Sequence, residues 1–301
     1  MPMPEIIRYV IRKLSQPADT FRALRLRADM TWLLVRNRFG WWPVATGKPG
    51  PVVSLTTYDR RVHAVHLAIE SIARGHTKPS RLILWLDDAA LYANLPHPLL
   101  RLQRRGLEIR FCKNYGPHKK YYPYVESQKV FTGPLVTADD DVIYPRSWLA
   151  GLQAAHKQFP NCVNCYRARV MALKDGKIAP YREWPLCESA DPSYRTVATG
   201  VSGVIYPSAL LQDLRAAGTD FEARCPKADD LWLHVQALRS GLHIRQIQPE
   251  PIHFPMIPGT QVTSLWAENC AHDDGNDRQL IVTYEAGDLE LLGRNSATAH
   301  A

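Results

Sequence analysis

The sequence contains no apolar run long enough to cross a lipid bilayer. Its longest runs, such as residues 82–86, have the length of a β-strand, whereas a membrane-spanning helix needs about 20 apolar residues. The N-terminus also lacks the pattern of a secretory signal, because Arg8, Arg12 and Lys13 interrupt its apolar positions and no small-residue cleavage site follows. We therefore expect a cytoplasmic protein.

Two glycine-rich nucleotide-binding motifs are missing. No Gly-x-Gly-x-x-Gly follows the first predicted strand, and no Gly-x-x-x-x-Gly-Lys-Ser/Thr occurs anywhere. Both motifs bring backbone N–H groups close to phosphates. Their absence argues against dinucleotide-dependent oxidoreductases and P-loop NTPases.

Cysteine is scarce, with six residues in a chain of 301. Cys162 and Cys165 form one Cys-x-x-Cys, which raises zinc binding and redox chemistry as alternatives. A structural zinc site needs a second pair of ligands at a compatible spacing, and the remaining cysteines are isolated. We expect buried free thiols instead.

Positive charge is concentrated near the N-terminus. The chain has 37 Lys and Arg against 29 Asp and Glu, a net charge of +8, and its 46% of hydrophobic residues is typical of a folded protein. Residues 1–40 hold eight basic residues and three acidic ones, and apolar residues recur there at helical spacing. We predict a basic amphipathic helical arm over residues 1–48, with one of its helices running from Asp19 to about Val35.

This arm has two kinds of candidate partner. Trp32, Trp41 and Trp42 add aromatic side chains that favour interfaces, and a basic amphipathic helix with tryptophans can lie on an anionic membrane surface. The same apolar stripe can pack on the protein's own domain or on a second subunit. The sequence leaves open whether the chain is peripheral to a membrane or forms a homo-oligomer.

Strands and helices alternate after the arm. Strands are expected over residues 51–57, 81–86, 106–111 and 133–138, and helices over residues 62–73 and 99–105. This rhythm predicts an α/β domain with a mostly parallel sheet, whose ligand site lies beyond the carboxyl ends of the strands. We assign residues 49–290 to this domain and residues 291–301 to a flexible tail.

Three consecutive carboxylates, Asp139, Asp140 and Asp141, follow the fourth predicted strand. Like charges this close repel one another, and their burial without compensation is costly. Mg²⁺ or Mn²⁺ removes the difficulty, because such ions prefer oxygen ligands and bridge carboxylates to substrate phosphates. The alternative is a solvated acidic turn that caps a helix beginning near Ser147.

A strand ending in Asp-x-Asp at this point in the chain resembles the GT-A fold of nucleotide-sugar glycosyltransferases. Further segments look like a family 2-like bacterial branch that builds surface polysaccharides such as capsule, lipopolysaccharide or exopolysaccharide. These segments are residues 116–121, 199–207, 228–233 and 264–266. The resemblance covers residues 52–280 and implies a mixed, mostly parallel central sheet flanked by helices.

The resemblance also implies residues for donor binding. An early Asp of the motif contacts the ribose, which points to Asp139, with Asp140 interchangeable. The base is implied to contact Asp87 or its neighbour, Asp88. The remaining implied donor contacts are Thr56 and Tyr58 in the first turn and Lys119 and Lys120 near the diphosphate. From the residues alone, the two lysines are equally consistent with a role in solubility.

A metal and a general base are implied in the same way. The last Asp of the motif, Asp141, would hold Mn²⁺ or Mg²⁺ together with Asp139, and His253 or His272 would be a further ligand. An acid near the start of a later helix would take the acceptor's proton, which points to Asp230 first and Asp229 second. Carboxylates there can equally serve only to cap that helix.

We therefore expect a metal-dependent, inverting hexosyltransferase that uses a nucleotide sugar, with UDP as the expected nucleotide. Its acceptor would be a glycan or a lipid-linked saccharide. The alternatives are a sugar-nucleotide nucleotidyltransferase and a non-catalytic nucleic-acid- or carbohydrate-binding protein. A nucleotidyltransferase would be expected to carry a Gly-rich basic signature after the first strand, and the sequence has none there. The nucleic-acid alternative has only net charge in its favour, so no nucleic-acid partner is expected.

Overall fold

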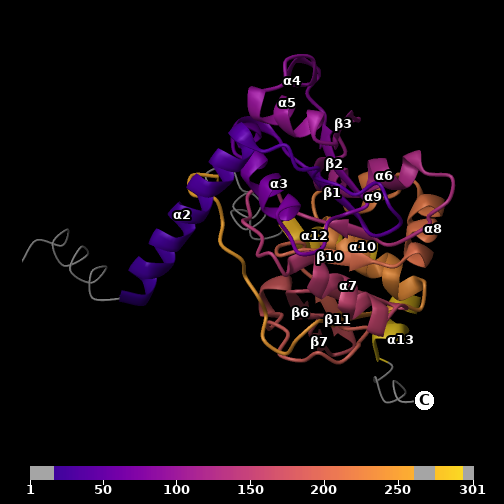
Figure 1. The fold of residues 1–301 in the computed structure, drawn as a ribbon. Helices are drawn as coiled ribbons and strands as arrows, with labels where there is room; N and C mark the ends of the chain where they lie inside the picture. The colour runs from indigo at the N-terminus through magenta and orange to yellow at the C-terminus, as the bar shows by residue number, and fades with distance from the viewer. Residues whose placement is uncertain (1–16, 261–274, 294–301) are drawn as a thin grey trace, which may run out of the picture.

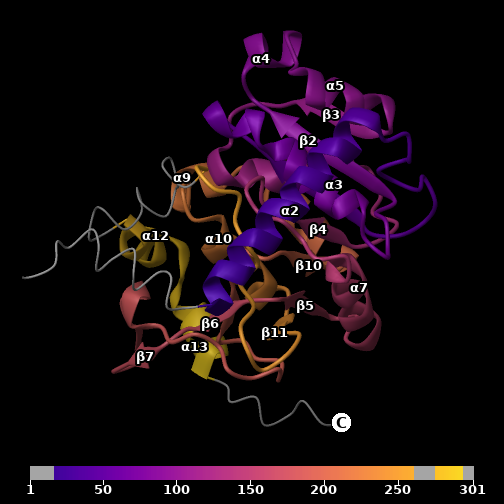
Figure 2. The same cartoon turned by 60° about the vertical axis from the view of Figure 1, so that its left-hand side comes forward.

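The fold is built around one seven-stranded sheet. A computed structural model describes residues 17–260 and 275–293 (Figure 1). In spatial order, the strands are β11 (His243–Gln246), β5 (Cys162–Cys165), β10 (Val204–Tyr206), β4 (Leu135–Thr137), β1 (Val52–Thr56), β2 (Arg81–Leu86) and β3 (Leu107–Phe111). Figure 2 shows this progression from β3 at the top to β11 near the bottom.

Most neighbouring strands run parallel. β1 pairs in parallel with both β2 and β4, β2 with β3, and β5 with β11. β10 is the exception, because it runs antiparallel to β4 and β5 on either side. The predicted mixed, mostly parallel sheet is confirmed, and the four strands predicted from the sequence correspond to β1 to β4.

Helices bury both faces of the sheet. Leu82, Leu84 and Leu86 of β2 pack with α3 (Val65–Ala73), α5 (His97–Arg104) and α7 (Trp148–Gln158). Ile83 and Trp85 of the same strand pack on the opposite side with α6 (Tyr122–Ser127), α8 (Ser208–Ala217) and α10 (Asp229–Arg239). Because successive side chains of a strand point to opposite faces, a strand covered on both sides is apolar throughout. This explains the uninterrupted apolar run at residues 82–86.

The shorter elements fill the connections. They are the 3-10 segments η1 (Asp59–His63), η2 (Gly116–Lys120) and η3 (Tyr181–Glu183), the helices α4 (Ala89–Ala93), α9 (Phe221–Arg224), α12 (Gly275–Thr283) and α13 (Ala286–Gly293), and the strands β6 (Ala168–Val170), β7 (Leu173–Lys174), β8 (Lys177–Ile178) and β9 (Thr196–Ala198). β6 pairs with β9 and β7 with β8, each in an antiparallel two-stranded sheet.

The arm helix α2 (Pro17–Phe39) contains the predicted helix and extends from the body at its N-terminal end (Figure 1). Leu33, one of its buried side chains, packs against Leu67 and Ala68 of α3. Glu70, also on α3 and fully buried, accepts hydrogen bonds from Arg36 at 3.0 Å and from Asn37 at 3.2 Å. Packing of the arm on its own domain, one of the alternatives, is therefore confirmed for α2. The first arm helix, expected before residue 17, lies outside the described residues.

None of the helices within residues 17–260 and 275–293 combines the length and the apolarity that a bilayer crossing requires.

The cysteines that the structure describes are free and buried. Burial raises the pKa of Cys162 and of Cys165, so neither thiol readily forms the thiolate that zinc binding and redox exchange need. The predicted buried free thiols are confirmed at Cys112, Cys162, Cys165, Cys187 and Cys225. Cys270 lies outside the described residues.

Candidate active site

A cavity of about 450 Å³ opens at the carboxyl ends of the central strands. Tyr58 reaches it from the end of β1 and Asp139 from the end of β4. Because β10 runs antiparallel, the turn that precedes it (residues 200–203) meets the same edge of the sheet. The site therefore lies where the α/β pattern predicts it, and its volume is within the range of ligand pockets.

The three aspartates separate into two orientations. Asp139 and Asp141 line the cavity, whereas Asp140 is buried beneath it. Asp140 accepts hydrogen bonds from the Thr57 hydroxyl at 2.6 Å and from Arg61 at 2.9 Å. The solvated acidic turn is wrong, because Asp140 and Asp141 are each only 4% exposed.

Arg61 neutralises part of this negative charge. Its Nη1 lies 2.9 Å from Asp140 and 3.0 Å from Asp141, and its Nε donates to the Thr260 carbonyl at 3.1 Å. Burial nevertheless raises the pKa of Asp139 to about 7, and the charges of Asp141 and Asp140 add to this against the opposing effect of Lys120. One guanidinium leaves the cluster short of positive charge.

The donor atoms fit a divalent cation that is shared with a substrate. Within the described ranges, no three His, Cys, Asp or Glu side chains come close enough to hold a metal ion. Asp139 and Asp141 nevertheless present carboxylate oxygens to one cavity, and Mg²⁺ is commonly held by one or two carboxylates plus substrate phosphates. His253 also lines the cavity and is exposed. Its role as a ligand stays a prediction, and His272 lies outside the described residues.

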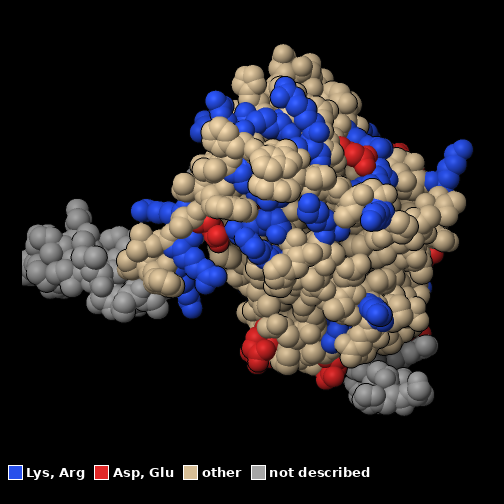
Figure 3. Space-filling view, in the orientation of Figure 1, with Lys and Arg blue, Asp and Glu red and all other residues tan. Residues whose placement is uncertain are grey.

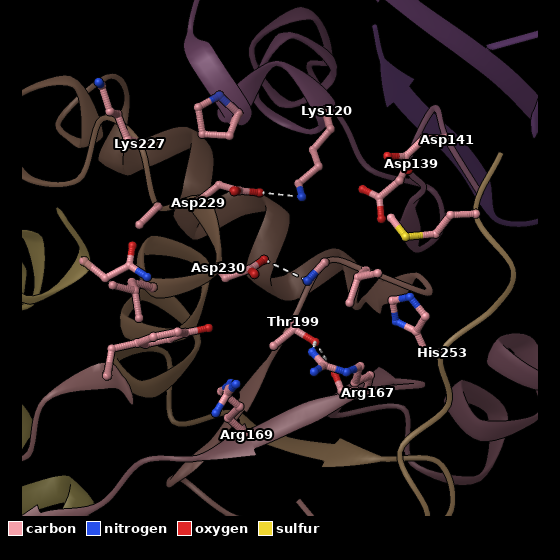
Figure 4. Close-up of a pocket in the computed structure, with 18 of the residues that line it drawn as sticks. Lys120, Asp139, Asp141, Arg167, Arg169, Thr199, Lys227, Asp229, Asp230 and His253 are labelled. Carbon is pink, nitrogen blue, oxygen red and sulfur yellow. Dashed lines mark hydrogen bonds and ion pairs between the residues drawn. The ribbon is translucent and has the colours of Figure 1, made fainter. Parts of the chain in front are cut away.

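Lys120, Asp229 and Asp230 form a second cluster across the cavity (Figure 4). Lys120 pairs with Asp229 at 2.8 Å, and the Gly200 N–H donates to Asp230 at 2.9 Å. α10 begins at Asp229, after Ala228, whose methyl side chain offers no capping oxygen. The two carboxylates therefore contact Lys120 and the Gly200 turn instead of acting only as caps.

The turn itself depends on two glycines. A Cβ on Gly200 would lie 2.4 Å from Lys120 Nζ and 3.1 Å from Asp230. Gly203 has a φ of +98°, and a Cβ there would meet the Trp148 indole at 2.7 Å. The backbone thus approaches the side chains of the site more closely than any residue with a Cβ allows.

The pKa values of Asp230 and Lys120 are both raised, but for different reasons. Burial raises the pKa of Asp230 to about 6, and the charge of Asp229 adds to this, while Lys120 and the Gly200 N–H oppose it. Burial lowers the pKa of Lys120, but the charges of Asp229, Asp230 and Asp139 outweigh it, so that the Lys120 pKa lies well above its usual value. Lys120 is therefore a fixed cation beside a carboxylate that titrates near neutrality.

Seven of the predicted residues that the structure describes line the cavity, and five do not. Those that line it are Tyr58, Lys120, Asp139, Asp141, Asp229, Asp230 and His253. Among the five, Asp88 accepts a hydrogen bond from the Leu91 N–H at 3.0 Å. Asp87 and Lys119 pair with each other at 2.5 Å, and Thr56 donates to the Trp85 carbonyl at 3.0 Å. Like Asp140, these three side chains face protein groups, so their contacts with a nucleotide stay predictions.

Sequence reasoning missed several cationic residues of the site. Arg61, Arg167, Arg169 and Lys227 all line the cavity. The sequence did carry a signal for Arg167 and Arg169, because two arginines spaced two residues apart in extended backbone point to the same face. Arg61 follows the first strand closely, but nothing in its sequence neighbourhood shows that it reaches an aspartate some 80 residues later.

Comparisons with known proteins give structural matches alone. No family model and no curated protein matches the sequence. The chain is similar to S. aureus TarS 1–349 in complex with UDP, at 14% identity and a TM-score of 0.49, over 81% of this chain and 70% of that one. The same TarS fragment without a named ligand gives 14% identity and a TM-score of 0.47, over 81% and 69%.

Two other solved structures are also similar. One is CMP:2-keto-3-deoxy-manno-octonic acid synthetase complexed with CTP, at 12% identity and a TM-score of 0.42, over 74% of this chain and 98% of that one. The other is 4-diphosphocytidyl-2C-methyl-D-erythritol synthase from Anaerococcus prevotii, at 10% identity and a TM-score of 0.43, over 69% and 91%.

Proposed function

We propose that the protein is a nucleotide-sugar glycosyltransferase. One observation carries this proposal: Asp139 and Asp141 face the same cavity as Asp230, a buried carboxylate whose pKa is raised to about 6. Carboxylates suited to a diphosphate-bound cation and a carboxylate suited to accept a proton are the two groups that sugar transfer to a hydroxyl needs.

The donor's diphosphate would lie at the Asp139 end. A divalent cation held there by Asp139 and Asp141 would neutralise charge on the departing nucleoside diphosphate. Arg61 is a cation at this end, with its Nη1 3.0 Å from Asp141. Lys120 is a second one, since Asp139 is among the charges that raise its pKa. We assign its ammonium to contact with an oxygen of the leaving group. UDP is the nucleotide we propose.

The acceptor hydroxyl would lie beside Asp230. Its oxygen attacks the anomeric carbon, its proton passes to the Asp230 carboxylate, and the bond from that carbon to the diphosphate oxygen breaks. The products are the glycoside, the nucleoside diphosphate and a protonated Asp230. Asp229 is less suited to this role because it is paired with Lys120, so we assign it to positioning. Attack by this route inverts the anomeric centre.

Binding of UDP is expected to raise the melting temperature of the wild type in the presence of Mn²⁺, because a ligand that binds only the native state stabilises it. The shift should shrink without Mn²⁺ and vanish in Asp141→Ala, which removes one of the two cavity carboxylates. A panel of nucleoside diphosphates, read by differential scanning fluorimetry, checks this. An equal UDP shift in wild type and Asp141→Ala would contradict the role of Asp141.

We further propose that the arm helix rests on an anionic membrane, where lipid-linked acceptors reside. Exposed apolar side chains concentrate between residues 21 and 42. They are Phe21, Leu24, Trp32, Leu34, Val35, Phe39, Trp41 and Trp42. Arg25, Arg27 and Arg38 are exposed on the same helix, and Figure 3 shows Lys and Arg gathered over this face. Tryptophan and arginine together favour an anionic lipid surface.

Replacement of exposed tryptophan should weaken this binding. Trp41→Ser is expected to reduce cosedimentation with vesicles that contain phosphatidylglycerol, because Trp41 is 75% exposed and its removal leaves the domain core intact. Tyr92→Ser, on α4 and also exposed, is the matched control and should bind like the wild type. Equal sedimentation of all three proteins, or sedimentation of the wild type without vesicles, would remove the membrane proposal.

A further inference from the structure

Two arginines form one wall of the cavity beside Asp230. Arg169 belongs to β6 and Arg167 immediately precedes it, so the two side chains point to the same face of the strand. Figure 4 shows them together, on the opposite side of Asp230 from Lys120. They therefore lie away from the carboxylates proposed to hold the donor's cation.

Neutral groups hold both guanidinium groups in place. Arg167 donates to the Thr199 hydroxyl at 3.1 Å, and Arg169 donates to the Trp184 carbonyl at 2.5 Å. Arg169 also lies over the Tyr181 ring, 5.5 Å from its centroid. The β6–β9 pairing fixes the backbone beneath them, with Arg169 opposite Val197. The two cations are thus positioned before any ligand arrives.

Within residues 17–260 and 275–293, no Asp or Glu oxygen lies within ion-pair distance of Arg167 or Arg169. Burial lowers the pKa of Arg167, and the positive charge of Arg169 lowers it further, with Tyr181 and Asp230 opposing. Two like charges held together in a partly buried wall are stabilised by an anion between them.

We propose that Arg167 and Arg169 bind an anionic group, a phosphate or a carboxylate, on the acceptor. The inference rests on the proposed function, because it takes the Asp230 side of the cavity as the acceptor side. A planar guanidinium suits either anion, since each offers two oxygens to its parallel N–H groups. A neutral saccharide would leave both arginines without an ion-pair partner among the described residues.

Calorimetric titration of the enzyme saturated with UDP and Mn²⁺ tests this, because the donor end is then filled. The probes are glycerol 3-phosphate with glycerol as its neutral counterpart, and glucuronate with glucose as its counterpart. We expect one anionic probe to bind at least about tenfold more tightly than its neutral counterpart. The probe that binds identifies phosphate or carboxylate as the group.

Arg169→Gln should raise the Kd for that anionic probe by at least about tenfold and leave the Kd for UDP within about twofold of the wild type. Arg169→Lys keeps the charge but loses the planar fork. Its affinity for the probe should therefore lie between those of the wild type and Arg169→Gln. Arg104→Gln, an exposed arginine on α5, is the control and should bind the probe like the wild type. Melting temperatures establish that each variant is folded.

Two results would overturn the inference. In the first, neither anionic probe binds more tightly than its neutral counterpart, which would mean that the arginines do not select an anion. In the second, Arg169→Gln weakens the binding of UDP, which would place the donor's phosphates at this wall. Failure of the wild type to bind UDP would instead contradict the proposed function, and the same probes, titrated without UDP, would still show whether Arg169 binds an anion.

Discussion

Asp230→Asn is expected to lower kcat/KM for sugar transfer by about 10²- to 10⁴-fold, the range that a general base contributes. An amide has nearly the same shape as the carboxylate and can still accept the Gly200 N–H, so the turn should keep its form. Because the base acts on the acceptor's proton, binding of the donor nucleotide should change by less than about twofold. Steady-state kinetics with a UDP-sugar, together with UDP titration, measure both quantities.

The pH profile supplies an independent readout of the same residue. Burial raises the pKa of Asp230 to about 6, so its carboxylate is protonated and inactive as a base below that pH. At saturating Mn²⁺, which would hold Asp139 ionised, wild-type kcat/KM should therefore rise with pH up to about 6 and then level off. In Asp230→Asn this limb of the profile, the rise up to about pH 6, should be absent from the residual activity.

Asp229→Asn is the matched comparison for Asp230→Asn. Asp229 pairs with Lys120 at 2.8 Å, so its loss should disturb the position of Lys120 without removing the proton acceptor. We expect a smaller loss of kcat/KM and a retained limb near pH 6. A larger loss in Asp229→Asn than in Asp230→Asn would exchange the two roles, and full activity in Asp230→Asn would refute a base at this position.

Glu70→Gln is expected to lower the free energy of unfolding by about 3–5 kcal/mol, the cost of breaking a buried ion pair by removing one partner. Glu70 is fully buried and binds Arg36, Asn37 and the buried Arg105. Without its charge, two arginine side chains between α2 and the domain lose their counter-ion. Denaturant unfolding followed by circular dichroism measures the change.

Glu108→Gln is the control for this comparison. Glu108 also pairs with two arginines, Arg81 and Arg110, but its side chain is 28% exposed. Ion pairs that water reaches contribute about 1 kcal/mol or less. Equal losses of stability in Glu70→Gln and Glu108→Gln would mean that burial of Glu70 does not determine how strongly α2 is held.

Local patterns predicted the frame of the fold and part of the site. Apolar runs identify β1 to β4 because these strands are buried on both faces, and the helical spacing from Asp19 identifies α2. The position of residues 139–141 after a strand predicts where the cavity opens. These features follow from periodicity and strand ends, which depend on a few neighbouring residues.

The partners of the charged residues depend on packing between distant segments. Arg61 reaches Asp140 and Asp141 only because β1 and β4 are neighbours in the sheet. Asp140 could not be told from Asp139 and Asp141 by sequence, because alternation at a strand end fixes which side chains share a face but not which face meets the cavity. The pairing of Lys119 with Asp87 was hidden for the same reason.

The identity of the leaving group tests the central proposal most directly. The enzyme, with Mn²⁺ and a mixture of glycan acceptors, is incubated with UDP-sugars in one series and with nucleoside triphosphates plus sugar phosphates in the other. Chromatography of the products separates UDP from pyrophosphate. Our account predicts that UDP is released from a UDP-sugar and that this release depends on Asp230. It also predicts that no pyrophosphate forms. Release of pyrophosphate from a nucleoside triphosphate, with UDP-sugars left intact, would contradict glycosyl transfer and identify a nucleotidyltransferase.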